Sequence, residues 1–278
     1  MEQGFTALTD PRARWKSVIR KHPWVSRGMQ WLFDPAFTPH HLIRRWVRQQ
    51  QGCVLNVGSG SRFLGHHVVN LDIEESAHVH VINRLEQIPF KDGSFEGVLL
   101  EYVLEHVGPY ENLIREAVRV LKPGGSLLLT VPFRQSYHGC PRDFWRFTHE
   151  GMELLLERSG LNNIQVEVHA GPTSAWIDAT KEFLSTLLSF GSPFFYGILS
   201  QVLILPFVPF RYLDVVLRKS PVARYTAFSF RMTAVKPGVP SAMNGRVSLH
   251  DKIERALWLP EGCSVKRVDG RWWIERYR

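Results

Sequence analysis

The sequence predicts an α/β fold built on a doubly wound, largely parallel sheet. Two observations carry this prediction. First, short apolar runs alternate with helical patterns between residues 53 and 168, as in sheets whose parallel strands are joined by crossover helices. Second, the apolar run 53–57 enters the glycine turn Gly58-Ser59-Gly60. Glycine has no Cβ, so the backbone of such a turn can approach a ligand closely.

Charge is distributed unevenly along the 278 residues, whose net charge is +8. Residues 1–51 hold nine Lys/Arg and three Asp/Glu, residues 52–180 hold ten and sixteen, and residues 181–278 hold fifteen and seven. Basic flanks around an acidic core favour a surface that meets phosphates or anionic lipid. An ordinary protein of high pI is the alternative. With 44% hydrophobic residues, the chain can form a proper core.

The three cysteines, Cys53, Cys140 and Cys263, lie far apart and form no CxxC pair. Their spacing predicts no metal site and no disulfide framework, and it favours a reducing, cytoplasmic setting. The first residues, MEQGFTALTDPRARW, contain no apolar stretch behind a basic start. We therefore expect no signal peptide.

Residues 1–50 are expected to be helical. Thr38-Pro39 is typical of a helix start, because a capping threonine precedes a proline at the first helical position. The following residues place an apolar face opposite several arginines, and that face consists of Leu42, Ile43, Trp46 and Val47. This N-terminal segment either packs against the core or forms a lid over a substrate pocket.

The core, residues 51–180, is predicted to contain strands 53–57, 68–73, 95–100, 127–131 and 164–168, with helices 111–121 and 149–159. The first of these helices has an apolar stripe that includes Leu113, Ala117 and Leu121. It is expected to end at Lys122-Pro123-Gly124-Gly125, because proline cannot continue a helix. A last core strand is expected over residues 225–235, inside the segment 225–240.

An apolar segment, residues 181–224, separates the core from its last strand. Its part 183–210 holds no charged residue over 28 positions, a length that suffices to cross a bilayer. Pro193, Pro206 and Pro209 interrupt it, however. Three interpretations stay open: a buried helical insertion, a contact in the plane of a membrane, and a true span.

The C-terminal tail, residues 241–278, ends in SVKRVDGRWWIERYR. Asp269-Gly270 between two strand-like runs predicts a β-hairpin. The tail can cover a sheet edge, pair with a second subunit in a homodimer, or close a pocket. The sequence does not choose among these three roles.

The acid at the end of the second strand, Asp72, is a candidate for accepting hydrogen bonds from ribose hydroxyls. It lies 12 residues after Gly60, and Phe63 stands where a GxGxxG motif has its third glycine. Both facts argue against a nicotinamide oxidoreductase, whose acid follows after roughly 20 residues. The alternative is that Asp72 is a turn residue at a strand end.

The run IPFKDGSFEGVLLEYVLEHV, residues 88–107, is followed closely by RVLKPGGSLLLTVP. Together with VLNVGSG and NLDIEE, it resembles the class I S-adenosylmethionine-dependent methyltransferases, in particular the small-molecule, type 11-like subgroup. The resemblance implies a Rossmann-like sheet of seven strands whose last strand, 225–235, is antiparallel. It also implies S-adenosyl-L-methionine as the cofactor.

By position, the resemblance implies a set of cofactor-binding residues. The set is Asn56, Gly58, Ser59, Gly60, Asp72, Ile73, Arg84, Leu85, Glu101, Tyr102 and His106. Within it, the glycine turn approaches the methionine part, Asp72 holds the ribose, and Ile73 touches the adenine. Residues 84 and 85 lie on the adenine side, and residues 101 and 102 line the sulfonium end. For His106, which comes after these sulfonium-end residues, structural packing is the alternative role.

Three positions depart from the family pattern. Asn56 and Arg84 stand at or near positions where the family often has aspartate, and Glu96 replaces the aspartate of SFD. The loss at 56 removes a charge partner for the cofactor's amino group, and Glu101 is a candidate replacement. These departures motivate a second hypothesis, in which the chain is a non-catalytic scaffold or interaction protein of the same fold.

A further motif, VPFRQSYHGCPRDFWRFT, covers residues 131–148 and resembles a bacterial subgroup of these enzymes. Its place after the fifth strand puts it at the carboxyl edge of the sheet, where ligands bind. His138 and Tyr137 are the candidate catalytic residues, with His138 as a general base on an acceptor hydroxyl. The alternative is that both anchor the loop. Asp143 and Arg146 are expected to pair, and Thr148 is expected to cap the next helix.

Methyl transfer from a sulfonium depends mainly on positioning the acceptor and excluding water, so an obvious catalytic dyad is not required. An Asp/Asn-Pro-Pro-Tyr motif, as in enzymes that methylate base amino groups, does not occur, and nucleic acid is not favoured as a partner. The apolar segment favours a small hydrophobic or lipid-linked acceptor. A contact with a membrane surface through residues 183–210 of a cytoplasmic protein is one of the interpretations that stay open.

Overall fold

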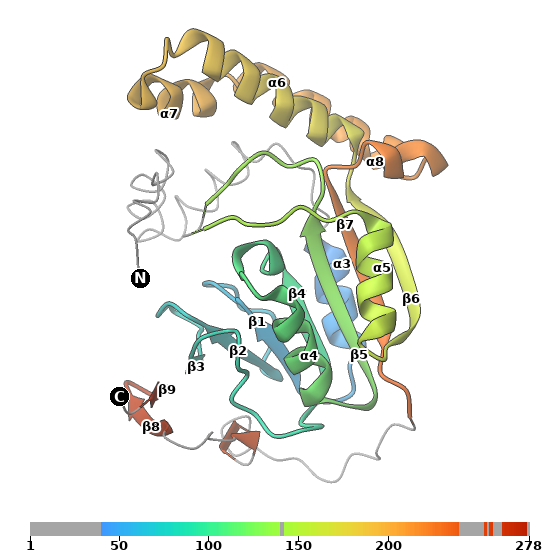
Figure 1. Ribbon diagram of the computed structural model, residues 1–278, viewed down its shortest axis with the longest axis vertical. Coiled ribbons are helices and arrows are strands. Elements are labelled where there is room, and N and C mark those ends of the chain that lie inside the picture. The colour runs from blue at the N-terminus through green and yellow to red at the C-terminus, as the bar shows by residue number, and fades with distance from the viewer. Residues whose placement is uncertain (1–39, 140–141, 239–252, 255, 258–262, 277–278) are drawn as a thin grey trace. The chain divides into compact units, whose positions relative to one another are not determined.

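The computed structural model describes residues 40–139, 142–238, 253–254, 256–257 and 263–276 (Figure 1). The described chain forms two compact units. The first, called the sheet unit here, contains the described residues within 39–131, 147–167 and 231–278. The second, the helical unit, contains Pro132–Arg146 and Val168–Phe230. The predicted helical segment before residue 40, with its Thr38-Pro39 start, lies outside the described residues.

A single sheet carries all nine strands of the described chain. The strands are β1 Val54–Val57, β2 Val68–Asp72, β3 Val81–Ile82, β4 Phe95–Glu101, β5 Leu121–Pro132, β6 Asn162–Ala170, β7 Ser229–Val235, β8 Cys263–Val268 and β9 Arg271–Arg276. Their order is β6-β7-β5-β4-β1-β2-β3-β9-β8. The chain therefore starts in the middle of the sheet and winds outward in both directions, as predicted for a doubly wound fold.

The central strands are parallel and buried. β1 lies between β2 and β4, and Val57 at its end is in register with Leu71 and Leu100. All four residues of β1 are buried, as expected for a strand covered on both faces. Because the strands run in the same direction, the ends of β1, β2 and β4 meet at one edge of the sheet.

β7 is antiparallel to β5. The Lys236 amide donates to the Gly125 carbonyl at 2.9 Å, and just beyond the far end of β5 the Phe133 amide donates to the Phe228 carbonyl, also at 2.9 Å. The pairing thus moves forward along β5 and backward along β7, so the predicted antiparallel last strand is confirmed. It begins at Ser229 and not at 225, because Pro221–Tyr225 forms a 3-10 turn, η3.

The seven expected strands are present as β1 to β7, and the C-terminal hairpin adds two further strands to the sheet. β8 and β9 pair in antiparallel fashion around Asp269 and Gly270, whose φ angles are 50° and 78°, as a tight hairpin turn requires. β9 then pairs in parallel with β3, and the Trp272 amide donates to the His80 carbonyl at 2.8 Å. Of the three roles open from the sequence, the tail covers a sheet edge.

The helical elements that cover the sheet unit include α3 His40–Gln49, η1 Leu104–His106, α4 Tyr110–Val120 and α5 His149–Arg158. Ile43 and Val47 of α3 pack on Val54 and Val68 of the sheet, so the described part of the N-terminal segment packs against the core. Thr148 caps α5, as predicted, by accepting a hydrogen bond from the Gly151 amide at 3.1 Å.

The C-terminal end of α4 is bound by Lys236, the residue directly after β7. Lys236 Nζ donates to the carbonyls of Val118 and Leu121, both at 2.7 Å, and so satisfies acceptors that a helix end leaves without partners. The segment that follows, which was expected to stop the helix, is the first part of β5.

The helical unit contains α6 Pro172–Leu188, α7 Pro193–Val202, η2 Leu205–Leu213, α8 Asp214–Leu217 and η3. Ile177, Ile204 and Val208 form a small apolar cluster inside it. Among the residues that the structure describes, no single helix has both the length and the apolar content to cross a membrane. α7 and the pair η2–α8 reach those criteria together, but a bend of 49° separates them.

Candidate active site

The edge where β1, β2 and β4 end carries the glycine turn. Gly58 and Gly60 adopt φ angles of 64° and 55°, a region that favours glycine. A Cβ on Gly58 would lie 2.5 Å from a methyl group of Val103, whereas one on Gly60 would meet nothing within 4 Å. Gly58 therefore permits close packing inside the protein, and Gly60 leaves an open approach for a ligand.

Asp72 closes the turn from the neighbouring strand. Its Oδ2 accepts from the Gly60 amide at 2.7 Å, and its Oδ1 accepts from the Glu74 amide at 3.0 Å. Ser76 Oγ donates to the Gly60 carbonyl at 2.7 Å. Each carboxylate oxygen has a second lone pair, and Asp72 is partly exposed. The side chain can thus hold the turn and still accept hydrogen bonds from a ligand.

Glu101 supplies a second acid at this edge, at the end of β4. Its side chain is 3% exposed and pairs with Arg62 from the loop after the glycine turn. Sequence reasoning identified Glu101 but missed Arg62, although a basic residue two positions beyond a ligand-binding turn was a usable signal. Tyr102 follows with φ of 54°, an uncommon conformation for a residue with a Cβ, and its amide donates to the Thr130 carbonyl at 3.0 Å.

Asn56 faces the interior of the sheet unit. Its Nδ2 donates to Asn70 Oδ1 at 3.0 Å, and Asn70 Nδ2 donates onward to the carbonyls of His78 and Arg62 at 2.9 and 3.1 Å. The Asn70 amide donates to His80 Nδ1 at 2.9 Å, so that nitrogen carries no proton. Burial, helped by the charge of His78, lowers the pKa of His80. This buried polar network braces the loops behind the glycine turn.

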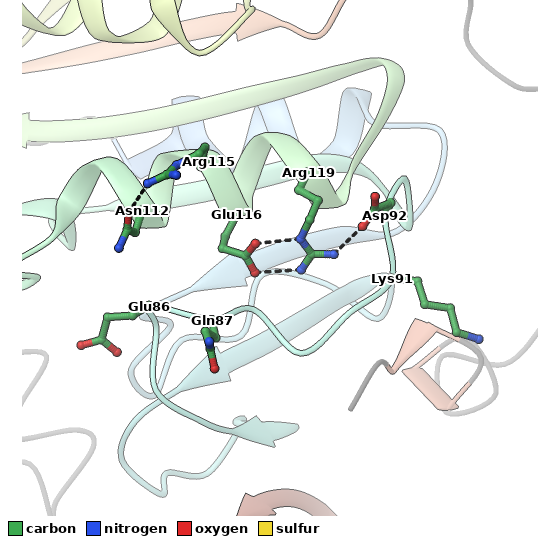
Figure 2. A pocket seen from close by; sticks show the side chains of 8 residues that line it. All are labelled: Glu86, Gln87, Lys91, Asp92, Asn112, Arg115, Glu116 and Arg119. Atoms are coloured by element: carbon green, nitrogen blue, oxygen red, sulfur yellow. Dashed lines mark hydrogen bonds and ion pairs between the residues drawn. The ribbon is translucent and has the colours of Figure 1, made fainter. Parts of the chain in front are cut away.

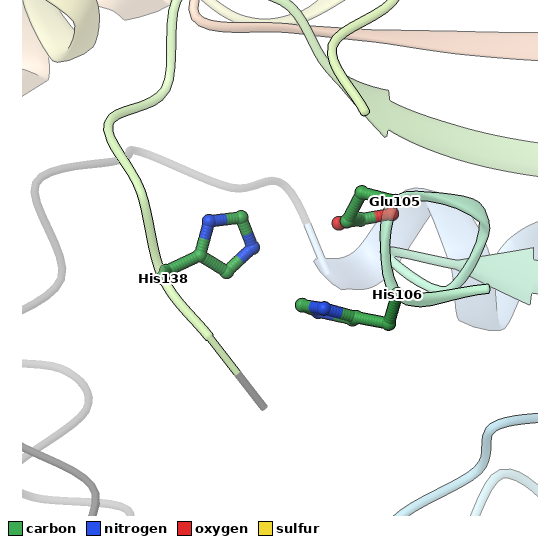
Figure 3. Close-up of side chains that lie close together, drawn as sticks. All are labelled: Glu105, His106 and His138. Carbon is green, nitrogen blue, oxygen red and sulfur yellow. The ribbon is translucent and has the colours of Figure 1, made fainter. Parts of the chain in front are cut away.

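The other predicted cofactor residues differ in exposure. Ser59 is buried, Ile73 is 45% exposed, and Leu85 is buried beside an exposed Arg84. His106 and the buried Glu105 come from η1, just beyond the end of β4 (Figure 3). Glu96, which departs from the family pattern, pairs with Lys122 at 2.5 Å near the start of β4, so its role is at the opposite edge of the sheet.

The candidate catalytic residues Tyr137 and His138 belong to the helical unit. His138 Nδ1 lies 3.1 Å from the Ser136 carbonyl and 3.4 Å from Asp143 Oδ2. A proton on Nδ1 satisfies these acceptors and leaves the lone pair on Nε2, the arrangement that a general base needs. Tyr137 is 53% exposed.

Asp143 and Arg146 form the predicted pair and hold this loop. Arg146 donates to both carboxylate oxygens, at 2.5 and 2.7 Å, and to the Ser136 carbonyl at 2.8 Å. Burial by itself would raise the pKa of Asp143, but the hydrogen bonds from Arg146 and the His138 amide, with the charges of both side chains, lower it. Asp143 is thus a fixed negative charge beside the imidazole.

A buried charged cluster anchors the same loop to α6. Asp178 Oδ2 accepts from the Ser136 amide at 2.7 Å, and Lys181 Nζ lies 3.0 Å from Asp178 and 2.8 Å from Glu182. Sequence analysis missed this cluster, because its members are far apart in the sequence from Ser136 and stand at the edge of an apolar run.

A separate hollow of the sheet unit is lined by polar side chains from α4 and the 86–92 loop (Figure 2). They are Glu86, Gln87, Lys91, Asp92, Asn112, Arg115, Glu116 and Arg119. Arg119 donates to the Ile88 and Phe90 carbonyls, at 2.8 and 2.7 Å, and to Glu116 and Asp92. These bonds fasten the loop to α4, and we assign the hollow a structural role.

Comparison with known proteins shows that residues 55–129 match the sequence model of a family described as a methyltransferase domain. A probable S-adenosylmethionine-dependent methyltransferase of Mycolicibacterium smegmatis is 29% identical over 101 residues, 30% of this chain and 39% of that protein. A demethylmenaquinone methyltransferase of Listeria monocytogenes is 34% identical over 76 residues, 22% of this chain and 32% of that protein. The chain spans at most about half the length of the curated relatives it matches.

Solved structures are similar over a larger part of the chain. A Thermotoga maritima protein described as an S-adenosylmethionine-dependent methyltransferase, possible histamine N-methyltransferase, is 16% identical. The match covers 79% of this chain and 99% of that one, with a TM-score of 0.47.

Proposed function

We propose that residues 55–129, which match a methyltransferase domain, form a class I S-adenosylmethionine-dependent methyltransferase domain, and that the protein is an enzyme that transfers the methyl group to a small hydrophobic or lipid-linked metabolite. The observation that carries the proposal is the edge of the sheet unit. There the open turn at Gly60 and the carboxylates of Asp72 and Glu101 follow the ends of three adjacent parallel strands, the usual ligand position in such sheets.

These residues fit the cofactor. The open space above Gly60 accommodates its approach, and Asp72 retains acceptor capacity for ribose hydroxyls. Glu101, buried and paired with Arg62, offers a negative charge for a cationic group. Because Asn56 turns inward to Asn70, Glu101 is the acid that takes the part of the missing aspartate at position 56.

When bound, the cofactor would supply a methyl group on a sulfonium sulfur, and the neutral thioether S-adenosylhomocysteine would be the leaving group. The protein then has to orient the acceptor, exclude water and, for a hydroxyl acceptor, remove a proton. We assign the last role to His138 Nε2. Asp143 and the Ser136 carbonyl orient the ring through Nδ1, and the negative charge of Asp143 stabilises the imidazolium that proton transfer forms.

The hydrophobic acceptor is supported by the helical unit, whose large apolar side chains are mostly exposed. The name of the matched demethylmenaquinone methyltransferases contains a quinone. This name is consistent with a hydrophobic acceptor for the present protein.

Calorimetric titration of the purified chain with S-adenosylmethionine and S-adenosylhomocysteine tests the premise. We expect micromolar binding of both, and folded protein that binds neither would contradict the assignment. An assay of labelled-methyl transfer to small hydrophobic or lipid-linked compounds then tests the proposed acceptor class. His138→Gln should lower kcat while cofactor affinity stays unchanged. Equal loss of turnover and cofactor binding would instead indicate that His138 only anchors its loop.

A further inference from the structure

The helical unit exposes an extensive apolar surface. Of the 26 large apolar side chains that are exposed among the described residues, 18 fall between residues 176 and 225. Phe190, Phe183 and Phe194 are 92%, 66% and 64% exposed. Water-soluble monomers rarely expose contiguous apolar patches of more than a few hundred Å², so a surface of this composition indicates a binding function.

α6 buries several polar and charged side chains beside Ala175 and Ile177, and it exposes large apolar ones. Ser174, Asp178, Lys181 and Ser185 recur at helical spacing and are all buried. Trp176, Phe183 and Leu187 also recur at helical spacing, and all three are exposed. A helix of a water-soluble protein has the reverse arrangement. The medium outside this face of α6 is therefore expected to be apolar.

α7 repeats this arrangement. Its buried residue is Ser200, whereas Phe194, Ile198 and Val202, spaced by four positions, are exposed. α7 has 10 residues, which makes it about 15 Å long at 1.5 Å per residue, about half the thickness of a bilayer's hydrocarbon core. Together with the 49° bend that follows α7, this length suits a helix lying in the membrane interface and not one crossing it.

The charges around this surface complement anionic lipid. Between residues 183 and 230 the sequence contains one acid, Asp214, which is fully buried as the cap of α6. Lys219 and Arg224, in contrast, are exposed directly after the apolar helices. Exposed cations beside an apolar helical face are typical of proteins that bind membranes containing anionic headgroups.

We propose that the surface formed by α6, α7, η2 and α8 docks in the plane of an anionic lipid bilayer, with its aromatic side chains at the boundary between headgroups and acyl chains. A second copy of the chain fits less well. In a symmetric dimer the same patch meets itself, so Lys219 and Arg224 would face a segment, residues 183–230, that has no exposed acid to pair with them.

Vesicle flotation of the full chain tests this inference. We expect it to float with vesicles of phosphatidylcholine and phosphatidylglycerol, and less with phosphatidylcholine alone. The double variant Phe183→Glu, Phe194→Glu should weaken partitioning by roughly tenfold to a hundredfold, because it removes two buried aromatic side chains from the lipid. Leu154→Glu is the matched control, since Leu154 is exposed on α5, outside this surface. It should float like the unmodified chain.

Two further measurements separate the alternatives. Lys219→Glu, Arg224→Glu should remove the preference for anionic vesicles, and unchanged cofactor affinity in every variant shows that each is folded. A folded chain that stays with the soluble fraction would overturn the proposal. If light scattering then shows a dimer that Phe183→Glu, Phe194→Glu dissociates, a second copy covers the surface. If it shows a monomer, another part of the same chain covers the surface. Resistance to carbonate extraction would also overturn docking in favour of a true span.

Discussion

Asp72 combines a structural role with its expected role in ligand binding. Its carboxylate holds the Gly60 and Glu74 amides and faces the edge where the ribose is expected. Asp72→Ala should weaken S-adenosylmethionine binding by roughly 10- to 100-fold, the effect of losing charge-assisted hydrogen bonds. Asp72→Asn keeps one acceptor oxygen and should lose less.

Calorimetry measures both Asp72 variants, and Glu86→Ala provides the matched control, because Glu86 is an exposed acid beside the hollow of Figure 2. The control should bind like the unmodified chain. Unchanged affinity in Asp72→Ala would remove this residue from the cofactor site.

His80 gives the sheet unit a pH dependence. Burial and His78 lower its pKa in the folded state below the 6.5 of the unfolded chain, so the unfolded state binds the proton more readily. The free energy of unfolding should therefore fall as the pH drops through 6.5, and it should keep falling until the folded-state pKa is reached. Protonation also breaks the bond from the Asn70 amide.

Urea unfolding at pH values on both sides of 6.5 measures this effect. His80→Asn keeps an acceptor for the Asn70 amide and does not titrate, so its stability should depend less on pH than that of the unmodified chain. His66→Asn, at an exposed position, should retain the unmodified slope. Equal slopes in all three proteins would contradict the assignment to His80.

Contacts between single residues were predictable from the sequence where they are local. The Asp143–Arg146 pair and the Thr148 cap span three positions each, and helical spacing or cap chemistry identifies both. Arg62 pairs with Glu101 across 39 positions, a distance over which only the strand order brings residues together. The bond from Asn56 to Asn70, 14 positions away, was not predictable for the same reason, and the assignment of Asn56 to the cofactor, which came from the family resemblance, stays a prediction.

At the scale of elements, α6 depends on an acid that lies about 40 residues away. Asp214 accepts from the Thr173 and Ser174 amides, both at 2.9 Å, from the Gly171 amide at 3.1 Å, and from Ser174 Oγ at 2.5 Å. It thus takes the place of a local N-cap side chain, since the residue at that position is Gly171.

Asp214→Ala should lower the free energy of unfolding by about 2–3 kcal/mol, because it leaves several buried donors without their acceptor. Urea unfolding measures the change, and limited proteolysis should show faster cleavage within residues 172–188. Ser174→Ala provides a graded comparison, because it removes one of the four hydrogen bonds. A loss in Asp214→Ala no larger than that in Ser174→Ala would contradict the role of Asp214 as the cap.

The sequence predicted an element well where its hydrophobic periodicity extended over several turns or where a clear signal marked its end. α4 was expected over 111–121 and is Tyr110–Val120, because four apolar positions define its buried face. β3 was missed because two residues, Val81–Ile82, are too few for any alternation to appear. The first part of β5 was read as a turn, because Pro123 and two glycines usually end regular structure, whereas here they enter the strand.

At the scale of the molecule, the alternation of strands and helices was sufficient to predict the fold class, since chirality and connection rules leave few arrangements for such a pattern. The number of strands was not predictable in this way. The turn at Asp269-Gly270 predicts a hairpin but says nothing about its partner, and β3 lies about 190 positions earlier in the chain.

The position of the hairpin leads to a prediction about association. β9 covers β3, and without it the sheet would end in a short strand with unpaired backbone groups, a template for edge-to-edge pairing. Trp272→Pro removes the amide that donates to the His80 carbonyl and replaces a buried indole. We expect the hairpin to detach, so that protease cleaves within residues 263–276 and light scattering shows association that increases with protein concentration. Trp272→Phe keeps the amide and an aromatic ring, and it should remain close to the unmodified chain. If Trp272→Pro neither associates nor becomes sensitive to protease, the pairing of β9 with β3 contributes little to protecting the sheet edge.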